Sequence, residues 1–425
     1  MLQKNFPYLI IFVGNAVIGY TLNFFWKALP PISCQFDFDV YTLFLSVLIY
    51  FSTTIISPIL VCDKFSRNNS LEHLSKVISY ISVFSWIPLI LSSTYFLHNF
   101  SFGKIASFAS FAFFGVGTGL LQSILYFFTY ISPIFKNYEE SSAILNFSFL
   151  TGKLFSDFIL FLTNWQISSF VGFYISYFYC SLLMKLFESQ KDGKNSLQLP
   201  PAMQISIDIS STSSSPFKLT SFCNNYLFIF MLSFVKYFSG KCFFEHFFAD
   251  FIFELNYSQL ILNFIFFAGS ILSLLISKYF RFKQTFPLTS TFSIISISII
   301  SYFVFHQNKY EWNLTQLFLI LSIIAWCIMY TMNFMMFPYV KICEVFKKST
   351  PSIQRSFLFS SSDWFVRLLS QLFYFYIGNY ISDDKQKISI ICFMNILCVS
   401  IGYALIMKKK EISDDLGQAK PLRNL

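Results

Sequence analysis

Charged side chains inside long apolar segments are the residues of this sequence best suited to chemistry. Lys153 and Asp157 lie four residues apart in one such segment, and Asp363 and Arg367 have the same spacing in another. Residues at i and i+4 share one face of a helix, so each pair can neutralise itself. A charge in lipid is costly and usually faces a cavity or a partner. These four residues are therefore candidate substrate contacts, the alternative being that each pair only lowers its own cost of insertion.

Three amide side chains in apolar segments are further candidates for the substrate site: Asn23, Gln122 and Asn333. An amide offers both a donor and an acceptor to a ligand. Gln122 follows the small-residue run 115–119, so the alternative is a close helix crossing in which Gln122 bonds a neighbouring helix. Asn333 follows Trp326, which could stack on a planar substrate; the alternative is ordinary core or lipid contact.

Composition excludes several classes of protein. Of 425 residues, 55% are hydrophobic and only 12% are charged, about half the charge of an ordinary soluble domain. A soluble enzyme and a disordered chain are thereby excluded. The net charge of +9 comes from short basic runs between apolar segments, so we expect no nucleic-acid partner. The sequence has no P-loop, G-x-S-x-G, H-E-x-x-H or CxxC motif, so we predict no cofactor, no metal and no enzymatic activity.

The apolar segments predict an all-α polytopic membrane protein, because a spanning helix needs roughly 20 apolar residues. A polar, serine-rich stretch interrupts them and is typical of a flexible linker. We predict a six-helix half at 1–187, a cytoplasmic linker at 188–219, and a second half with a short basic tail at 220–425. An eleven-helix alternative leaves 387–407 along the surface. The twelve predicted spans are 7–28, 40–62, 75–97, 105–130, 143–163, 166–187, 220–240, 258–279, 286–306, 313–339, 355–379 and 387–407.

The distribution of Lys and Arg predicts the orientation of the chain. Basic residues gather in alternate loops and in the run 408–410, and cytoplasmic loops carry that excess. Both termini are therefore expected in the cytoplasm. The sequence does not distinguish the plasma membrane from an organelle membrane.

The loop after the second predicted span contains Asp63, Lys64 and Arg67. The stretch DKFSR at 63–67 resembles the D-[RK]-x-G-[RK] core of the loop signature of the major facilitator superfamily, with Ser66 in place of the usual glycine. In that superfamily the loop charges latch the inner gate, so the resemblance implies a gating role for these three residues. The alternative is an ordinary positive inner loop.

A second resemblance is to the equilibrative nucleoside transporters. The stretch GYTLNFFWKA at 19–28 resembles the G-x-L-L-P-W-N-x-F-x-x-A stretch of their first helix, and GLLQSILYF at 119–127 looks like their fourth helix. The resemblance implies a major-facilitator-like fold, with Asn23 and Gln122 in the substrate cavity. The eighth span here lacks the D-x-x-x-R of that family, which has eleven helices.

These observations together predict a solute transporter that works by alternating access, most simply for nucleosides or nucleobases. Inverted or parallel helix repeats rocking about a mid-membrane site are the usual architecture of such carriers. Its expected partners are a small-molecule substrate, the lipid bilayer and, if one Asp titrates, a coupled proton. Two alternatives stay open: another facilitator-type carrier, for amino acids, sugars or organic anions, and a non-transporting carrier-like membrane protein.

Overall fold

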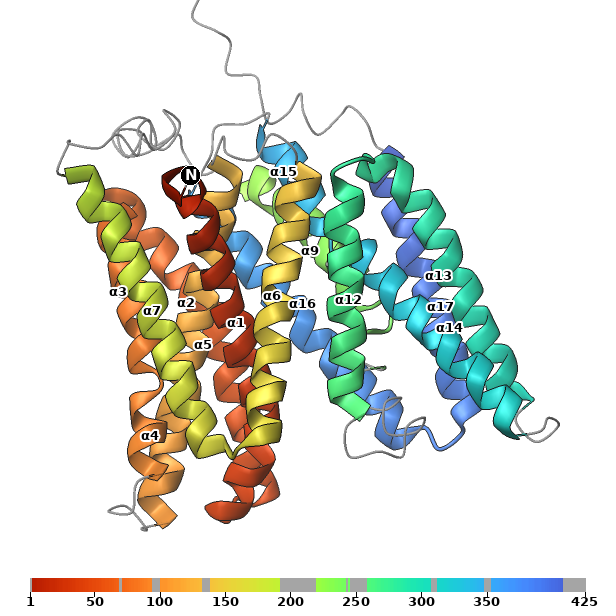
Figure 1. Ribbon diagram of the computed structural model, residues 1–425, viewed down its shortest axis with the longest axis horizontal. Helices are drawn as coiled ribbons and strands as arrows, with labels where there is room; N and C mark the ends of the chain where they lie inside the picture. The colour runs from red at the N-terminus through yellow and green to blue at the C-terminus, as the bar shows by residue number, and fades with distance from the viewer. Residues whose placement is uncertain are drawn as a thin grey trace, which may run out of the picture.

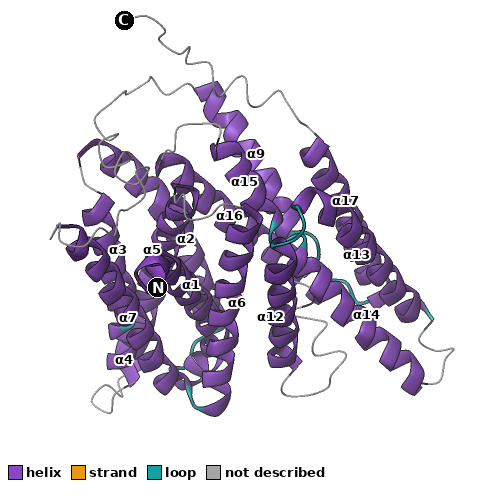
Figure 2. Ribbon diagram, turned by 45° about the horizontal axis from the view of Figure 1, so that its top comes forward, coloured by secondary structure: helices purple, strands orange, loops and turns teal. Residues whose placement is uncertain are grey.

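The computed structural model is helical throughout the part of the chain that it describes, without a strand there (Figures 1 and 2). The described residues are 2–68, 71–93, 100–131, 138–191, 219–241, 244, 258–306, 312–347 and 353–407. The helices are α1 (Leu2–Gln35), α2 (Val40–Asn68), α3 (Leu71–Phe84), α4 (Ile87–Ser93), α5 (Phe100–Ile131), α6 (Tyr138–Leu162), α7 (Trp165–Lys191), α9 (Leu219–Tyr237), α12 (Ser258–Ser277), α13 (Phe282–Phe305), α14 (Trp312–Met332), α15 (Phe337–Lys347), α16 (Ile353–Tyr380) and α17 (Asp384–Met407).

Ten spans within the described residues are long and apolar enough to cross a membrane. The short apolar helix α9 and the more polar α16 complete the twelve predicted spans. Residues 384–406, which include most of the last predicted segment, are one of the ten. The prediction of an all-helical, polytopic protein is thus confirmed.

Two spans are broken, and each break precedes a proline. Pro88 is the second residue of α4, and Pro338 is the second residue of α15. Proline lacks a backbone N–H, and its ring clashes with the carbonyl oxygen four residues earlier. α3 and α4 therefore share one span, as do α14 and α15.

The outer surface of the molecule is apolar. Many large hydrophobic side chains are exposed along the helices, including Ile105 at 66%, Tyr174 at 65% and Phe393 at 64%. So extensive an apolar surface is unfavourable in water but suits contact with lipid tails. The chain is accordingly a multi-pass integral membrane protein.

The helices form two groups in space. α1 to α7 gather on one side of the molecule and α12, α13, α14 and α17 on the other, with α9, α15 and α16 between them (Figure 1). The groups meet where α16 packs on α2 and α5, and where α12 packs on α6. Ser360 of α16 donates to the backbone oxygen of Gly119 at 2.9 Å, and Ser361 to that of Ile55 at 2.8 Å. Small residues thus allow α16 to lie close against the first group.

Asp39 caps the start of α2, in the connection between the first two spans. Its carboxylate accepts a hydrogen bond from the backbone N–H of Thr42 at 2.8 Å and another from the Thr42 hydroxyl. These hydrogen bonds from Thr42 lower the pKa of Asp39, because they favour its ionised form.

A pH dependence follows for the first turn of α2. The ionised cap is fully present above the ordinary aspartate pKa of about 3.9 and is lost as the pH falls through the lower folded value. We expect hydrogen exchange at Thr42 to lose protection only below a pH of about 4. Asp39→Ala should lose this protection at every pH; undiminished protection in that variant would contradict the assignment.

Candidate functional site

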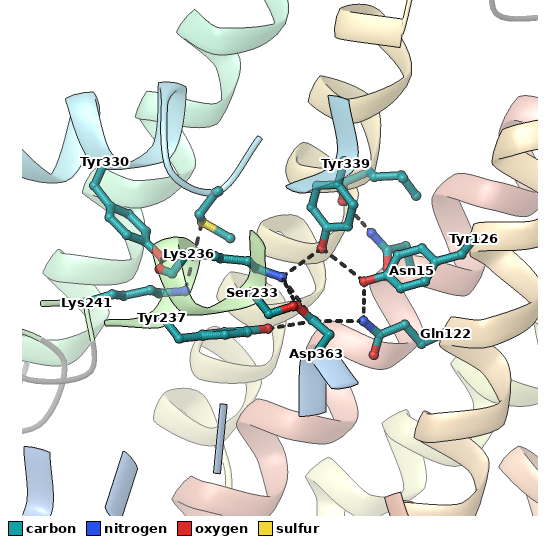
Figure 3. Close-up of polar contacts among 12 residues, drawn as sticks. Asn15, Gln122, Tyr126, Ser233, Lys236, Tyr237, Lys241, Tyr330, Tyr339 and Asp363 are labelled. Atoms are coloured by element: carbon teal, nitrogen blue, oxygen red, sulfur yellow. Dashed lines mark hydrogen bonds and ion pairs between the residues drawn. The ribbon is translucent and has the colours of Figure 1, made fainter. Parts of the chain in front are cut away.

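The carboxylate of Asp363, buried on α16, is the centre of a polar cluster (Figure 3). It accepts hydrogen bonds from the hydroxyl of Tyr237 at 2.8 Å, from Ser233 Oγ at 3.2 Å and from Gln122 Nε2 at 3.2 Å. Lys236 Nζ forms an ion pair with it at 3.2 Å. Four donors thus compensate the cost of burying this charge.

α9 supplies three of these donors from one face. Ser233, Lys236 and Tyr237 are spaced i, i+3 and i+4, which places them side by side on a helix. The ammonium of Lys236 also lies 4.6 Å from the ring centroid of Tyr237 and 4.8 Å from that of Tyr339. It donates to the Tyr339 hydroxyl at 3.2 Å. Its positive charge is therefore held by one carboxylate and two electron-rich rings.

α5, a helix of the first group, also joins the cluster. Gln122 donates to the hydroxyl of Tyr126 as well as to Asp363, and Tyr126 in turn lies 3.4 Å from Tyr339, hydroxyl to hydroxyl. All three side chains are less than one-tenth exposed. A continuous hydrogen-bonded network thus crosses from α5 to α9, α15 and α16 (Figure 3).

Asp157 is the centre of a second, smaller cluster. Its Oδ1 accepts from Asn23 Nδ2 of α1 at 2.6 Å, and its Oδ2 accepts from Asn263 Nδ2 of α12. Asn23 also donates to the backbone oxygen of Lys153 at 3.2 Å. All four residues are buried. This cluster likewise joins the two groups of helices, through α12 and α6.

The aspartates of both i, i+4 pairs have partners on other helices. Both oxygens of Asp157 bond to amides, although Lys153 stands one turn earlier on α6. Asp363 forms an ion pair with Lys236 of α9. The spacing puts two side chains on one helix face, but a neighbouring helix can bring its donors closer to a carboxylate than the same helix does.

Arg367 is buried among aromatic rings. Its guanidinium carbon lies 5.1 Å from the ring centroid of Trp364, 5.6 Å from that of Tyr237 and 5.9 Å from that of Phe149. Guanidinium groups favour such stacked positions over aromatic faces. Phe149 belongs to α6, so Arg367 also reaches across to the first group of helices.

The remaining predicted site residues lie apart from these clusters. Asn333 follows the end of α14 and donates to Ser290 Oγ of α13 at 2.7 Å, which is a contact between neighbouring helices of one group. Asp63, Lys64 and Arg67 belong to the last turns of α2, not to a loop, and their side chains lie outside what the structure describes. No cluster of three His, Cys, Asp or Glu side chains that could bind a metal occurs among the described residues.

Six members of the clusters were not among the site residues predicted from the sequence: Tyr126, Ser233, Lys236, Tyr237, Asn263 and Tyr339. Lys236 carried the clearest signal, because a lysine inside an apolar helix requires a partner or a route to the interface. We note that Asn263 is the one strongly polar amide in the apolar part of α12. No spacing in the sequence indicated that either residue meets an aspartate more than 100 positions away.

Comparison with known proteins identifies the fold. No protein-family model and no curated protein matches the chain. Among solved structures, the chain is similar to the proton:xylose symporter XylE bound to 6-bromo-6-deoxy-D-glucose, with a TM-score of 0.69 and 12% identity over 95% of both chains. It is also similar to the transporter FucP in its outward conformation (TM-score 0.66, 10% identity, 96% of this chain and 100% of that chain). The human organic anion transporter MFSD10 matches with a TM-score of 0.64 and 10% identity, over 94% of this chain and 99% of that chain.

These likenesses establish the fold of the chain and not its activity. XylE and FucP are major facilitator superfamily proteins, and the chain aligns with all three structures over nearly its full length. The major-facilitator-like fold predicted from the sequence is confirmed. The resemblance to equilibrative nucleoside transporters stays a prediction.

Proposed function

We propose that this chain is a solute carrier that moves a small molecule across a membrane by alternating access. The observation that carries the proposal is the Asp363 cluster, which joins α5 of the first helix group to α9, α15 and α16, the helices between the two groups. Buried ionisable residues in membrane helices are costly and typically mark a substrate or ion pathway. A mid-membrane site between two helix groups is the arrangement that alternating access uses.

The proposed moving parts are the predicted halves, 1–187 and 220–425, connected by the linker 188–219. The strength of the contacts supports this division. The ion pair between Lys236 and Asp363 lies within the second half, whereas Gln122 reaches Asp363 across the boundary through a neutral amide. A hydrogen bond from a neutral donor to a charged group contributes about 1.5–3 kcal/mol, whereas breaking a buried ion pair costs about 3–5 kcal/mol. The contacts across the boundary between the halves therefore break more easily than the contacts inside the second half.

A nucleoside or nucleobase is the first substrate class we propose to test. Asn23 and Gln122 supply amides that could bond a base or a sugar hydroxyl, and Tyr126, Tyr237 and Tyr339 supply rings and hydroxyls beside Gln122 and Asp363. The similar proteins favour two alternatives: a sugar, as in XylE, and an organic anion, as in MFSD10. Amino acids are a further alternative, because both clusters contain fixed charges.

The remaining parts of the proposal concern coupling, orientation and activity. XylE is a proton:xylose symporter, and its likeness supports testing a proton gradient as the driving force here. Both termini are proposed to lie in the cytoplasm, from the basic inner loops. We infer a carrier and not an enzyme. A non-transporting carrier-like protein is the competing interpretation, and measurable flux would exclude it.

The proposed function predicts saturable uptake that depends on Gln122. We expect cells lacking their own transporters to take up labelled adenosine or hypoxanthine when they express the chain. Gln122→Ala should raise the half-saturation concentration about tenfold, since one hydrogen bond to a buried polar group contributes about 1.4 kcal/mol. Asp363→Asn should abolish uptake, because it leaves Lys236 buried without its ion-pair partner.

Gln166→Ala provides the matched control for Gln122→Ala. Gln166 of α7 donates to Gln35 Oε1 at 3.1 Å, away from both clusters, so its loss should leave uptake unchanged. Surface expression of each variant is measured in parallel. Surface-expressed wild type without uptake of either compound would discard the nucleoside class; a wider panel of sugars, amino acids and organic anions without uptake would discard the carrier.

A further inference from the structure

The carboxylate of Asp157 divides its two oxygens between helices that belong to different groups. Oδ1 is bonded to Asn23 of α1, and Oδ2 is bonded to Asn263 of α12. Asn23 is fixed a second time by its bond to the backbone oxygen of Lys153, on the same helix as Asp157. The bond to Asn263 is therefore the exchangeable one, since α12 packs on α6 from the other group.

Separation of α12 from α6 would leave two buried polar groups without partners. The carboxylate oxygen would lose its donor, and the amide of Asn263 would lose its acceptor. Both residues are buried, Asp157 at 6% and Asn263 at 5% exposure, so the loss carries a large free-energy cost unless something replaces the bond. The replacement must donate to Oδ2 and can also bond the amide of Asn263.

The chemistry of the site selects the replacement. A hydroxyl donates and accepts at once, and two adjacent hydroxyls can bond a carboxylate and a neighbouring amide together. A net charge on the ligand is disfavoured. Asp157 repels an anion and Lys153, one turn away on the same face, repels a cation. α12 contributes no charged side chain of its own.

We propose that Asp157, Asn23 and Asn263 form a subsite for a vicinal diol on a neutral solute, such as the ribose of a ribonucleoside or a sugar ring. The inference rests on the proposed carrier function, because the α6–α12 contact must open to admit the solute. The Asp363 cluster is a poorer candidate for this role, because three of the donors to its carboxylate come from α9 within the same half.

Binding measurements on the purified full chain in detergent test the subsite without requiring flux. The probes are adenosine, 2′,3′-dideoxyadenosine, which lacks the diol, and D-xylose. If the solute is a ribonucleoside, wild type should bind adenosine at least tenfold more tightly than the dideoxy analogue. Asp157→Asn and Asn263→Ala should reduce that preference to within twofold.

The D-xylose arm distinguishes the second source of a diol. If the solute is a sugar, the wild type should bind D-xylose, and the same two variants should weaken its binding at least tenfold. Asn395→Ala is the matched control, because Asn395 of α17 is a buried amide that donates to the backbone oxygen of Ser239 at 3.0 Å, away from Asp157. It should leave both affinities and the diol preference as in wild type.

Several results would overturn the subsite. In the first, the wild type binds neither adenosine nor D-xylose. In the second, it binds the dideoxy analogue as tightly as adenosine and does not bind D-xylose. In the third, the two variants keep the wild-type preference or affinity. Asp157→Asn and Asn263→Ala alter opposite sides of one hydrogen bond. If one of these variants does not fold, the binding measurement on the other still tests the subsite. Diol-selective binding without flux in proteoliposomes would refute the carrier function and support the subsite. Flux of solutes without a diol, and of no others, would support the carrier function and refute the subsite.

Discussion

Replacing Lys236 with methionine is expected to lower the free energy of unfolding by about 3–5 kcal/mol, because it leaves the Asp363 carboxylate buried without a counter-charge. The ammonium and the carboxylate are 3.2 Å apart, and their side chains are 4% and 2% exposed. Both groups are therefore almost wholly shielded from water. Methionine approximates the volume of lysine, so the effect reports the lost charge and not a cavity. Thermal unfolding of the purified protein in detergent measures it.

A double variant separates the ion pair from its surroundings. Lys236→Met with Asp363→Asn removes both charges and keeps one acceptor oxygen, while the new amide NH2 can donate to a neighbouring hydroxyl of Tyr237 or Ser233. We expect it to recover most of the stability that the single variant loses, since a neutral pair of similar volume costs little to bury. Equal melting temperatures for the single and double variants would contradict the ion pair as the source of the loss. Transport should stay impaired in both variants.

The general architecture could be predicted from the sequence because it depends on a one-dimensional quantity. A run of apolar residues long enough to span a bilayer is a local property, and it located even the span of α16, where Asp363 and Arg367 interrupt the apolar pattern. The two helix breaks were missed, although Pro88 and Pro338 marked them. A window that averages hydropathy over a span does not register one backbone interruption.

The candidate site was predicted only in part. Asp157 and Asp363 were singled out as candidate substrate contacts because they are charges in apolar segments, and the structure buries both. Their partners were not, since a partner depends on how separate helices pack. For Gln122, two roles were left open: a contact with the substrate, or a hydrogen bond at a close helix crossing. The structure places it in a bond to Asp363, from a helix 241 positions away in the chain.

The second large effect is expected at Gly152 of α6, where this helix packs against α1. A Cβ atom added to Gly152 would come well within 3.0 Å of the backbone oxygen of Ala16, and one added to Gly19 would do the same at the oxygen of Phe149. Both obstacles are backbone atoms, which cannot rotate away. The two glycines therefore allow α1 and α6 to touch along their backbones.

Gly152→Ala is expected to destabilise the protein by about 3 kcal/mol or more, at the upper end of the usual cost of overpacking. The methyl group must push α1 away from α6, which also strains the bond between Asn23 and Asp157. Both the yield of monodisperse protein and its melting temperature should fall, and any ligand selectivity that depends on Asp157 should weaken with them.

Gly117→Ala tests whether the contact with backbone, and not the loss of a glycine, causes that effect. A Cβ at Gly117 would lie 3.2 Å from Ser82 Oγ, a side-chain atom that can move. Alanine is also the better helix former by about 1 kcal/mol, which favours this substitution wherever space permits. We therefore expect Gly117→Ala to be neutral or stabilising. If Gly152→Ala and Gly117→Ala change the melting temperature equally, the contact between the backbones of α1 and α6 cannot be what requires glycine at position 152. The geometry that holds Asn23 against Asp157 must then depend on other contacts between these helices.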